Sequence, residues 1–175
     1  MIALDGVRER RRKVYFSRYT HGPLNTELYR VSLHGGHPVA ITTRPGTHVI
    51  DMAPGGGAYV DTYSNAVTPP RVTLVNLRHD RHTVIQPAVR LPYRFQAPRF
   101  LTFPAADGHT RLYARLILPP HFDPHERYPV IMFQYGGPDA PPSVRNVWRG
   151  ASFLFDERLA CRGFVLFATD NRAAT

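Results

Sequence analysis

The chain has 175 residues, with 22 Lys and Arg against 13 Asp and Glu, and carries a formal net charge of +9. At roughly 100–200 residues per domain, this length predicts one domain, or one and a part of another. Hydrophobic residues make up 43% and charged residues 20%, which excludes a disordered chain. The 17 Pro and 13 Gly are spread along the sequence and indicate many short elements joined by turns, not a helical bundle.

The most strongly basic stretch is residues 8–13, Arg-Glu-Arg-Arg-Arg-Lys. Such a cluster can contact nucleic acid or an acidic membrane surface. No aromatic residue interleaves it, however, and no nucleic-acid motif follows. A solvated turn is the better interpretation, and we expect no nucleic-acid partner.

The lone Cys161 excludes an internal disulfide and leaves the redox compartment open. The first residues contain no apolar core of a signal peptide, and the longest apolar stretches are too short to cross a bilayer. We therefore expect a soluble chain without a membrane segment. Its localisation, cytoplasmic or periplasmic, stays open.

From residue 13 to about residue 85 the sequence predicts short β-strands, because β-branched and aromatic residues alternate between Gly- and Pro-rich turns. The predicted strands are 14–19, 28–33, 39–42, 48–52, 58–63, 71–77 and 82–85.

These strands repeat along the chain. A shift of 44 residues places Tyr15 on Tyr59 and Tyr19 on Tyr63, and the order of strands and turns is kept. A period of about 40–50 residues with four strands per unit is typical of β-propeller blades. A propeller closes with about four blades or more, whereas at most one and a half are expected here. Chance alignment of strand-rich sequence is the alternative explanation.

After residue 85 several prolines interrupt the pattern, and a different order of elements follows. A nearly all-apolar strand is expected to be buried on both faces of a sheet. In the helix that comes next, Ser152 suits the N-cap and Gly163 suits the left-handed residue after the end. A strand, a helix and a second buried strand indicate the opening of an α/β sheet. The predicted elements are a hairpin of strands 100–103 and 111–118, the strand 128–135, the helix 152–162 and the strand 164–170.

Residues 128–138, Tyr-Pro-Val-Ile-Met-Phe-Gln-Tyr-Gly-Gly-Pro, resemble the dipeptidyl peptidase IV branch of the prolyl oligopeptidase family of serine peptidases. In that branch such a strand and turn open the α/β-hydrolase domain. The resemblance covers about residue 14 to the end of the chain. Further matching motifs, in the same order, are 28–31 with 35–36, 59–64, 69–72 and 170–172.

The resemblance implies a mixed fold. Residues 1–90 would form the end of a β-propeller domain, its last one to two blades of antiparallel strands. Residues 91–175 would form the N-terminal part of an α/β-hydrolase peptidase domain.

The resemblance also implies an activity, the release of X-Pro or X-Ala dipeptides from the N-terminus of peptides. The full-length enzyme would bind a peptide substrate, use no cofactor and could form a homodimer. Its Ser-Asp-His triad would follow the matched region, so we expect a fragment that is inactive alone because the triad lies beyond Thr175. None of the five serines lies in a G-x-S-x-G elbow, and Ser152 comes nearest.

Tyr135 is the one candidate catalytic residue. By the resemblance, its hydroxyl donates to the oxyanion of the tetrahedral intermediate. Gly136 and Gly137 would form the loop that supports this oxyanion site. From the residue pattern alone, an aromatic side chain that packs at a strand end is the alternative.

Two histidine pairs share a spacing, His34 with His37 and His79 with His82. Both pairs lie in predicted turns without supporting Cys or carboxylate ligands, so we expect no metal site.

As a function from another class, the chain could be a non-catalytic β-rich protein-interaction module that associates through exposed strand edges.

Overall fold

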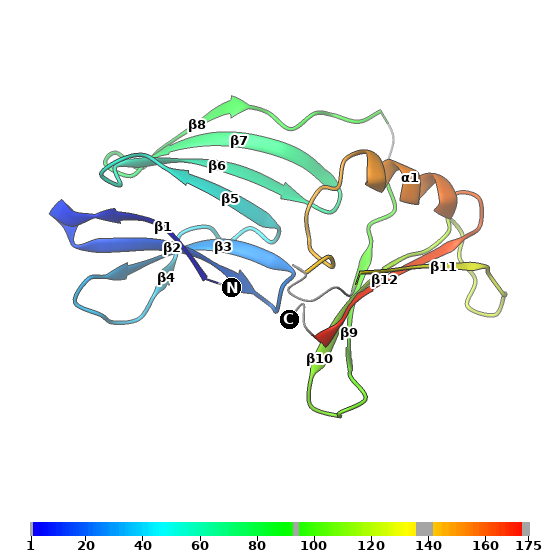
Figure 1. Ribbon diagram of the computed structural model, residues 1–175. Coiled ribbons are helices and arrows are strands. Elements are labelled where there is room, and N and C mark those ends of the chain that lie inside the picture. The colour runs from blue at the N-terminus through cyan, green and yellow to red at the C-terminus, as the bar shows by residue number, and fades with distance from the viewer. Residues whose placement is uncertain (1, 93–94, 136–141, 173–175) are drawn as a thin grey trace.

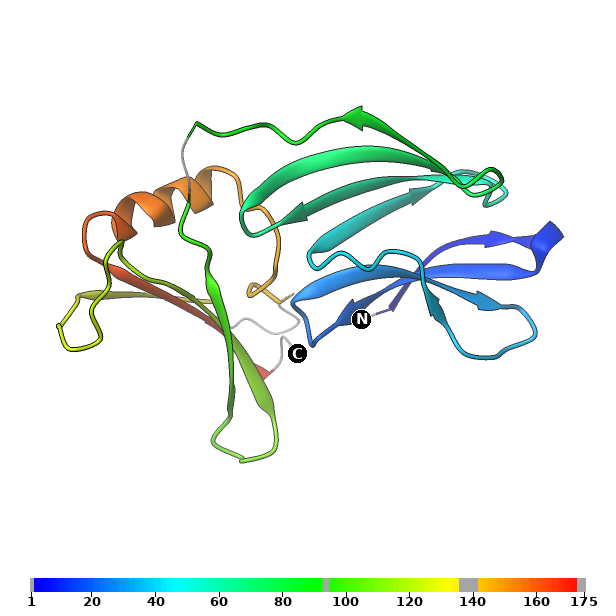
Figure 2. The same cartoon turned by 180° about the vertical axis from the view of Figure 1, so that it is seen from behind.

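The computed structural model describes residues 2–92, 95–135 and 142–172, which form two β-sheets (Figures 1 and 2). In the first sheet the strands lie in the order β1-β2-β3-β5-β6-β7-β8, and β4 pairs with β3 beside this path. The strands are β1 (Ile2–Arg8), β2 (Lys13–Thr20), β3 (Asn25–Ser32), β4 (Val39–Ala40), β5 (Thr47–Met52), β6 (Ala58–Asn65), β7 (Thr68–Asn76) and β8 (Arg81–Gln86).

The first sheet consists of two antiparallel four-stranded units, β1–β4 and β5–β8. A single parallel pair, Thr26 with Thr47, joins them. The expectation of at most one and a half units was wrong, because it overlooked β1. This strand has little inward-facing apolar surface: Ile2 is 73% and Leu4 is 69% exposed. Backbone pairing with β2, which sequence alternation does not reveal, is what forms it.

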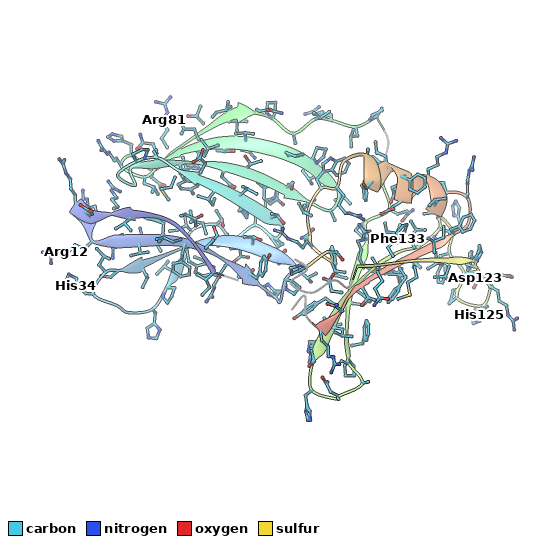
Figure 3. All side chains as sticks on the ribbon, viewed as in Figure 1. Arg12, His34, Arg81, Asp123, His125 and Phe133 are labelled. Carbon is cyan, nitrogen blue, oxygen red and sulfur yellow. The ribbon has the colours of Figure 1, made fainter. Side chains whose placement is uncertain are left out.

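The basic stretch forms the exposed turn that its composition predicts. Glu9–Arg11 is a short 3-10 helix without buried residues, and Arg12 follows in the left-handed region with φ 48°. Figure 3 shows Arg12 and His34 at the end of the first sheet that points away from the second sheet. The Arg12 guanidinium lies 3.0 Å from the His34 ring.

The core of the first sheet joins its two units through residues that the repeat relates. Tyr15 and Tyr59 are each 2% exposed and share one cluster with Leu28 and Val75. Burial, followed by the nearby charge of Asp61, raises the pKa of Tyr59 to about 12. The 44-residue repeat therefore has a physical basis: equivalent tyrosines fill the space between the units.

The second sheet has the strand order β11-β12-β10-β9 and carries one helix. β11 and β12 are parallel and are connected through α1, whereas β10 is antiparallel to both of its neighbours. Figure 1 shows α1 against one face of this sheet, where Ile117, Ala160 and Leu166 form the core. The elements are β9 (Arg99–Pro104), β10 (Arg111–Ile117), β11 (Val130–Tyr135), α1 (Ala151–Ala160) and β12 (Val165–Asp170).

The expectation that 128–135 is buried on both faces was wrong. Within the described residues β11 pairs only with β12, so it is an edge strand. Val130 is 61%, Met132 55% and Phe133 39% exposed. An apolar run predicts a strand, but it does not say how many neighbours the strand has.

The start of the helix also differs from the prediction. Gly150, not Ser152, is the N-cap, with φ 58° and no side-chain hydrogen bond. Packing fixes this end instead: Phe153 is 1% exposed, with its ring centroid 5.0 Å from that of Trp148. Beyond the other end Gly163 has φ 89°, which confirms the predicted left-handed residue.

Two adjacent carboxylates of α1 are buried, and their environments differ. Asp156 accepts hydrogen bonds from Arg115 and Arg149, each at 3.1 Å. Desolvation first, and then the charge of Arg149, lowers the pKa of Arg115 to about 10. Among the described residues, Glu157 accepts one hydrogen bond, from the backbone N–H of Gln96 to Oε2 at 3.0 Å, and its buried Oε1 has no partner.

We predict that replacing Glu157 by Gln removes a pH dependence of stability. Burial raises the pKa of Glu157 above its ordinary 4.5, with a smaller contribution from Asp156 and opposed by the Gln96 hydrogen bond. The folded state therefore binds this proton more tightly than the unfolded state. The resulting stability is fully present below the ordinary pKa and is lost as the pH rises through the raised pKa of the folded state.

Urea denaturation at a series of pH values from about 4 to 7 measures this effect. The free energy of unfolding of the unmodified chain should fall, relative to that of Glu157→Gln, as the pH increases. Glu126→Gln, at an exposed position, is the matched control and should follow the unmodified chain. A difference between Glu157→Gln and the unmodified chain that is constant over this range contradicts the assignment.

Candidate functional site

The candidate site lies where β11 and β12 end. Because these strands are parallel, their carboxyl ends meet at one edge of the sheet, and their last residues, Tyr135 and Asp170, are register partners. In α/β proteins this is the edge at which ligands bind. Of Tyr135 only the backbone is described, and Gly136 and Gly137 lie outside the described residues.

A buried carboxylate at this edge anchors residues 143 and 144. Asp170 is 1% exposed, and its Oδ1 accepts hydrogen bonds from the backbone N–H (2.8 Å) and the hydroxyl of Ser143. Its Oδ2 accepts from the N–H of Val144 at 2.9 Å. Val144 is itself fully buried. Asp170 thus fixes the far end of the connection that begins at Tyr135.

The same segment then docks on the first sheet through Asn146. Its N–H donates to the carbonyl of Leu24 (2.8 Å), and its carbonyl accepts from the hydroxyl of Thr47 (3.1 Å). In its side chain, Oδ1 accepts from the N–H of Ala66 (3.0 Å) and Nδ2 donates to Asn25 (3.1 Å). Each polar group of Asn146 is paired, and the partners come from both four-stranded units.

Neighbouring contacts strengthen the junction between the sheets. Arg145 donates to the hydroxyl of Thr26 at 3.0 Å. The turn between β2 and β3 approaches β10 so closely that a Cβ on Gly22 would lie 2.0 Å from the ring of Tyr113. Only glycine fits there, and its φ of 67° also favours glycine. The edge that carries Tyr135 is therefore held at a defined place relative to the first sheet.

Asp170 and Asn146 were missed by the sequence reasoning. Asp170 belongs to a quoted motif, but no role was assigned to it. For Asp170 the single available signal was a carboxylate at the end of an apolar strand. For Asn146 the sequence contains no such signal, because its hydrogen-bond partners are distant in sequence.

An apolar cavity of about 510 Å³ reaches the same edge. It lies on the face of the second sheet opposite α1, and Phe103, Met132 and Phe167 contribute to its walls. Asp170 lines its end. Its composition suits an apolar group more than a charged one.

All five serines lie within the described residues, and none makes a hydrogen bond to a histidine ring. Ser17 donates to Asp5, Ser143 donates to Asp170, and the hydroxyl of Ser64 accepts from the N–H of Trp148. Ser152 is exposed on α1. None of these environments contains the serine–histidine hydrogen bond of an activated serine nucleophile.

The histidine pairs of the sequence lie on exposed turns and strands. His34 contacts Arg12, and His82 lies 3.7 Å from Asp80. Across residues 2–92, 95–135 and 142–172, no group of three or more His, Cys, Asp or Glu side chains is arranged to hold a metal ion. In these ranges no helix has the length and apolar character needed to span a membrane.

Comparison with known proteins gives a consistent result. A family model described as "Dipeptidyl peptidase IV (DPP IV) N-terminal region" matches residues 2–70. Human dipeptidyl peptidase 8 is 30% identical over 180 residues, which cover 96% of this chain and 20% of that protein. A probable dipeptidyl-aminopeptidase B from Aspergillus clavatus is 29% identical over 169 residues, which cover 91% of this chain and 18% of that protein.

The fold agrees with this relationship. The crystal structure of Porphyromonas gingivalis dipeptidyl peptidase 4 matches with a TM-score of 0.82 at 24% identity, over 95% of this chain and 24% of that chain. The two sheets are thus a partial β-propeller and the first part of an α/β-hydrolase sheet, as predicted. These similarities agree with the resemblance to the dipeptidyl peptidase IV branch of the prolyl oligopeptidase family. It spans about a fifth of the length of the curated relatives it matches.

We predict that Asp170→Asn releases the segment anchored at this edge. The amide has one acceptor oxygen where the carboxylate has two, so at least one of the buried donors on Ser143 and Val144 loses its partner. The expected loss is about 2–3 kcal/mol in the free energy of unfolding. Urea denaturation measures the loss, and hydrogen exchange at the amides of residues 143 and 144 should become faster.

Asp80→Asn is the matched control, because the Asp80 side chain is fully exposed and its contact with His82 is long. Its stability should stay within about 0.5 kcal/mol of the unmodified chain. Equal stability of the two variants, with unchanged exchange at 143 and 144, contradicts the anchoring role of Asp170.

Proposed function

We propose that this chain is part of a serine peptidase that releases dipeptides from the N-terminus of peptides. The observation that carries the proposal is the alignment of 96% of the chain with a dipeptidyl peptidase. In this proposal residues 1–90 are the end of the propeller domain and residues 91–175 the start of the peptidase domain. The division is supported by the two sheets, which occupy residues 2–86 and 99–170.

In the proposed reaction a serine outside this chain attacks the scissile carbonyl, and the C–N bond breaks as the rest of the peptide leaves as an amine. Water then hydrolyses the acyl-enzyme and releases the dipeptide. Tyr135 donates its hydroxyl to the oxyanion, and Gly136 and Gly137 form the supporting loop. Such a donor lowers the barrier by roughly 3–4 kcal/mol when its position is fixed before the reaction. Pairing with β12 and the anchor at Asp170 support a fixed position, because they hold both ends of this connection.

The substrates of the proposed enzyme are peptides with Pro or Ala at the second position, and the enzyme could act as a homodimer. The chain alone is proposed to be inactive. None of its serines has the hydrogen-bonded histidine that nucleophilic catalysis requires, and Ser143 is engaged by Asp170.

We predict that Tyr135→Phe strongly reduces turnover in a protein that carries these residues in a complete peptidase. A suitable protein is human dipeptidyl peptidase 8 in which residues 1–175 of this chain replace the aligned segment. The variant should lower kcat for a Gly-Pro chromogenic substrate by about 10²–10³-fold with little change in KM, because the lost hydrogen bond forms only in the transition state.

Tyr128→Phe, at the start of the same motif, is the matched control. The Tyr128 hydroxyl accepts a hydrogen bond from the N–H of Asp123 (3.0 Å), and Tyr128 lies at the opposite end of β11 from Tyr135. It should keep the kcat of the parent chimera. An unchanged kcat in Tyr135→Phe contradicts the catalytic role. Turnover by the isolated chain contradicts its proposed inactivity.

A non-catalytic interaction module is the second candidate. It is favoured by exposed apolar residues on the outer strands, such as Leu4 on β1 and Ile85 on β8, which are 69% and 59% exposed. The chimera separates the two candidates, because a module that does not contribute to catalysis would show no specific dependence of kcat on Tyr135.

A further inference from the structure

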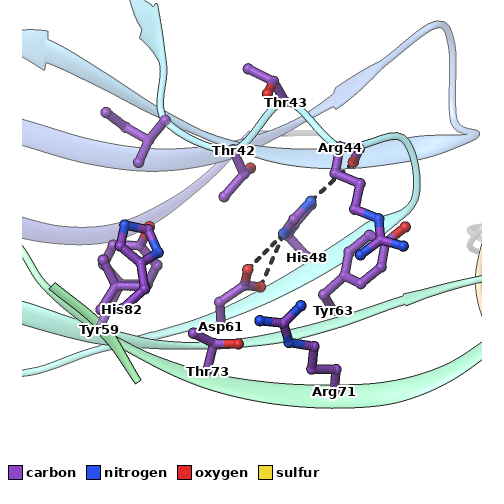
Figure 4. Close-up of a pocket in the computed structure, with 12 residues that line it drawn as sticks. Thr42, Thr43, Arg44, His48, Tyr59, Asp61, Tyr63, Arg71, Thr73 and His82 are labelled. Atoms are coloured by element: carbon purple, nitrogen blue, oxygen red, sulfur yellow. Dashed lines mark hydrogen bonds and ion pairs between the residues drawn. The ribbon is translucent and has the colours of Figure 1, made fainter. Parts of the chain in front are cut away.

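A polar cavity of about 220 Å³ lies in the first sheet, far from the Tyr135 edge (Figure 4). The strands β5, β6 and β7 form its floor, and the connection from β4 to β5 closes one side. Two motifs that carry the resemblance, 59–64 and 69–72, contribute residues to this cavity, but the sequence analysis assigned them no role and the proposed peptidase function does not use them. The polar residues that matter for its chemistry are Thr42, Arg44, His48, Asp61, Arg71 and Thr73.

The single carboxylate among the residues that line the cavity, Asp61, already has a hydrogen-bonding partner. The Nδ1 of His48 lies 2.9 and 3.0 Å from the two carboxylate oxygens of Asp61. Its Nε2 lies 3.1 Å from the carbonyl oxygen of Arg44, which can only accept. Both ring nitrogens of His48 therefore face oxygen atoms, and the ring links Asp61 to the connection that follows β4. His48 is 5% exposed, so these contacts are shielded from water.

Two arginines line the same cavity as this carboxylate. Among the described residues neither Arg44 nor Arg71 forms an ion pair. The Nε of Arg71 is buried and has no hydrogen-bond partner. The guanidinium of Arg44 lies 4.5 Å from the centre of the Tyr63 ring. Figure 4 shows the Arg44 guanidinium against Tyr63, whereas the Arg71 side chain extends toward Asp61 in the same cavity.

A buried donor without an acceptor, such as the Nε of Arg71, is unfavourable, and a bound anion would supply the acceptor. The cavity also offers hydroxyl groups. The Oγ1 of Thr42 accepts from the N–H of Leu28 at 2.9 Å, which leaves its own proton free to donate. Thr73 is a second buried hydroxyl in the wall. Guanidinium forks and hydroxyls together match the oxygens of a small tetrahedral anion.

We propose that this cavity binds a compact, doubly charged oxyanion of the phosphate class, with Arg44 and Arg71 as its main ligands. Arg71 belongs to β7, whereas Arg44 belongs to the connection between the two four-stranded units. The anion therefore joins the second unit to this connection and stabilises the first sheet.

Titration of the 175-residue chain with inorganic phosphate tests the proposal, with sodium chloride of equal ionic strength as reference. Calorimetry should give one site per chain, and Tm should rise with phosphate concentration because the ligand binds only the folded state. Arg71→Gln and Arg44→Gln should each weaken phosphate binding by about tenfold or more, as expected for lost charge-assisted hydrogen bonds. Arg71→Lys keeps the charge and should bind with intermediate affinity.

Arg81→Gln is the matched control, because it removes one positive charge from an exposed position on β8 outside the cavity (Figure 3). It should bind phosphate as the unmodified chain does. Circular dichroism checks that each variant is folded, and the two arginine positions provide independent tests. The proposal is wrong if phosphate has no effect beyond chloride, if acetate binds as tightly as phosphate, or if Arg81→Gln weakens binding as much as the cavity variants.

Discussion

The arrangement of the two sheets depends on the hydrogen bonds of Asn146. This residue contacts the β2–β3 turn, β5 and the β6–β7 turn through both its backbone and its side chain. Three residues earlier, Ser143 is held by Asp170 at the end of β12. A short stretch of chain therefore connects the propeller part directly to the edge of the hydrolase sheet. Because these groups are paired inside the protein, displacing the stretch would leave buried donors and acceptors unsatisfied.

This connection gives a physical reason why the two parts act as one unit in the proposed enzyme. An oxyanion donor contributes to catalysis only when its position is set before the charge develops. The backbone of Tyr135 is fixed by β12, and the return of the chain is fixed by Asp170 and Asn146. The first sheet would then influence the position of the edge that carries Tyr135 through the hydrogen bonds of Asn146, and not only through the chain segment that connects β8 to β9.

Much of the fold could be predicted because local patterns carry it. Alternation predicted β2 to β8, the 44-residue repeat predicted equivalent units in which Tyr15 corresponds to Tyr59, and an apolar run predicted β11. Burial was harder to predict, since the number of neighbours of β11 is a property of the whole sheet. The strand β1 was missed because its side chains are largely exposed and only backbone pairing marks it. The contacts of Asn146 join residues 80 and 121 positions apart, which no local pattern encodes.

The most direct test of this coupling is native-state hydrogen exchange on the unmodified chain and on Asn146→Ala. In the unmodified chain the protected amides of β3 and β12 should open with the same free energy, because the sheets unfold together. In Asn146→Ala the two values should separate, with β12 opening at a lower free energy than β3. Different opening free energies in the unmodified chain, or equal values in Asn146→Ala, would contradict the central role of Asn146.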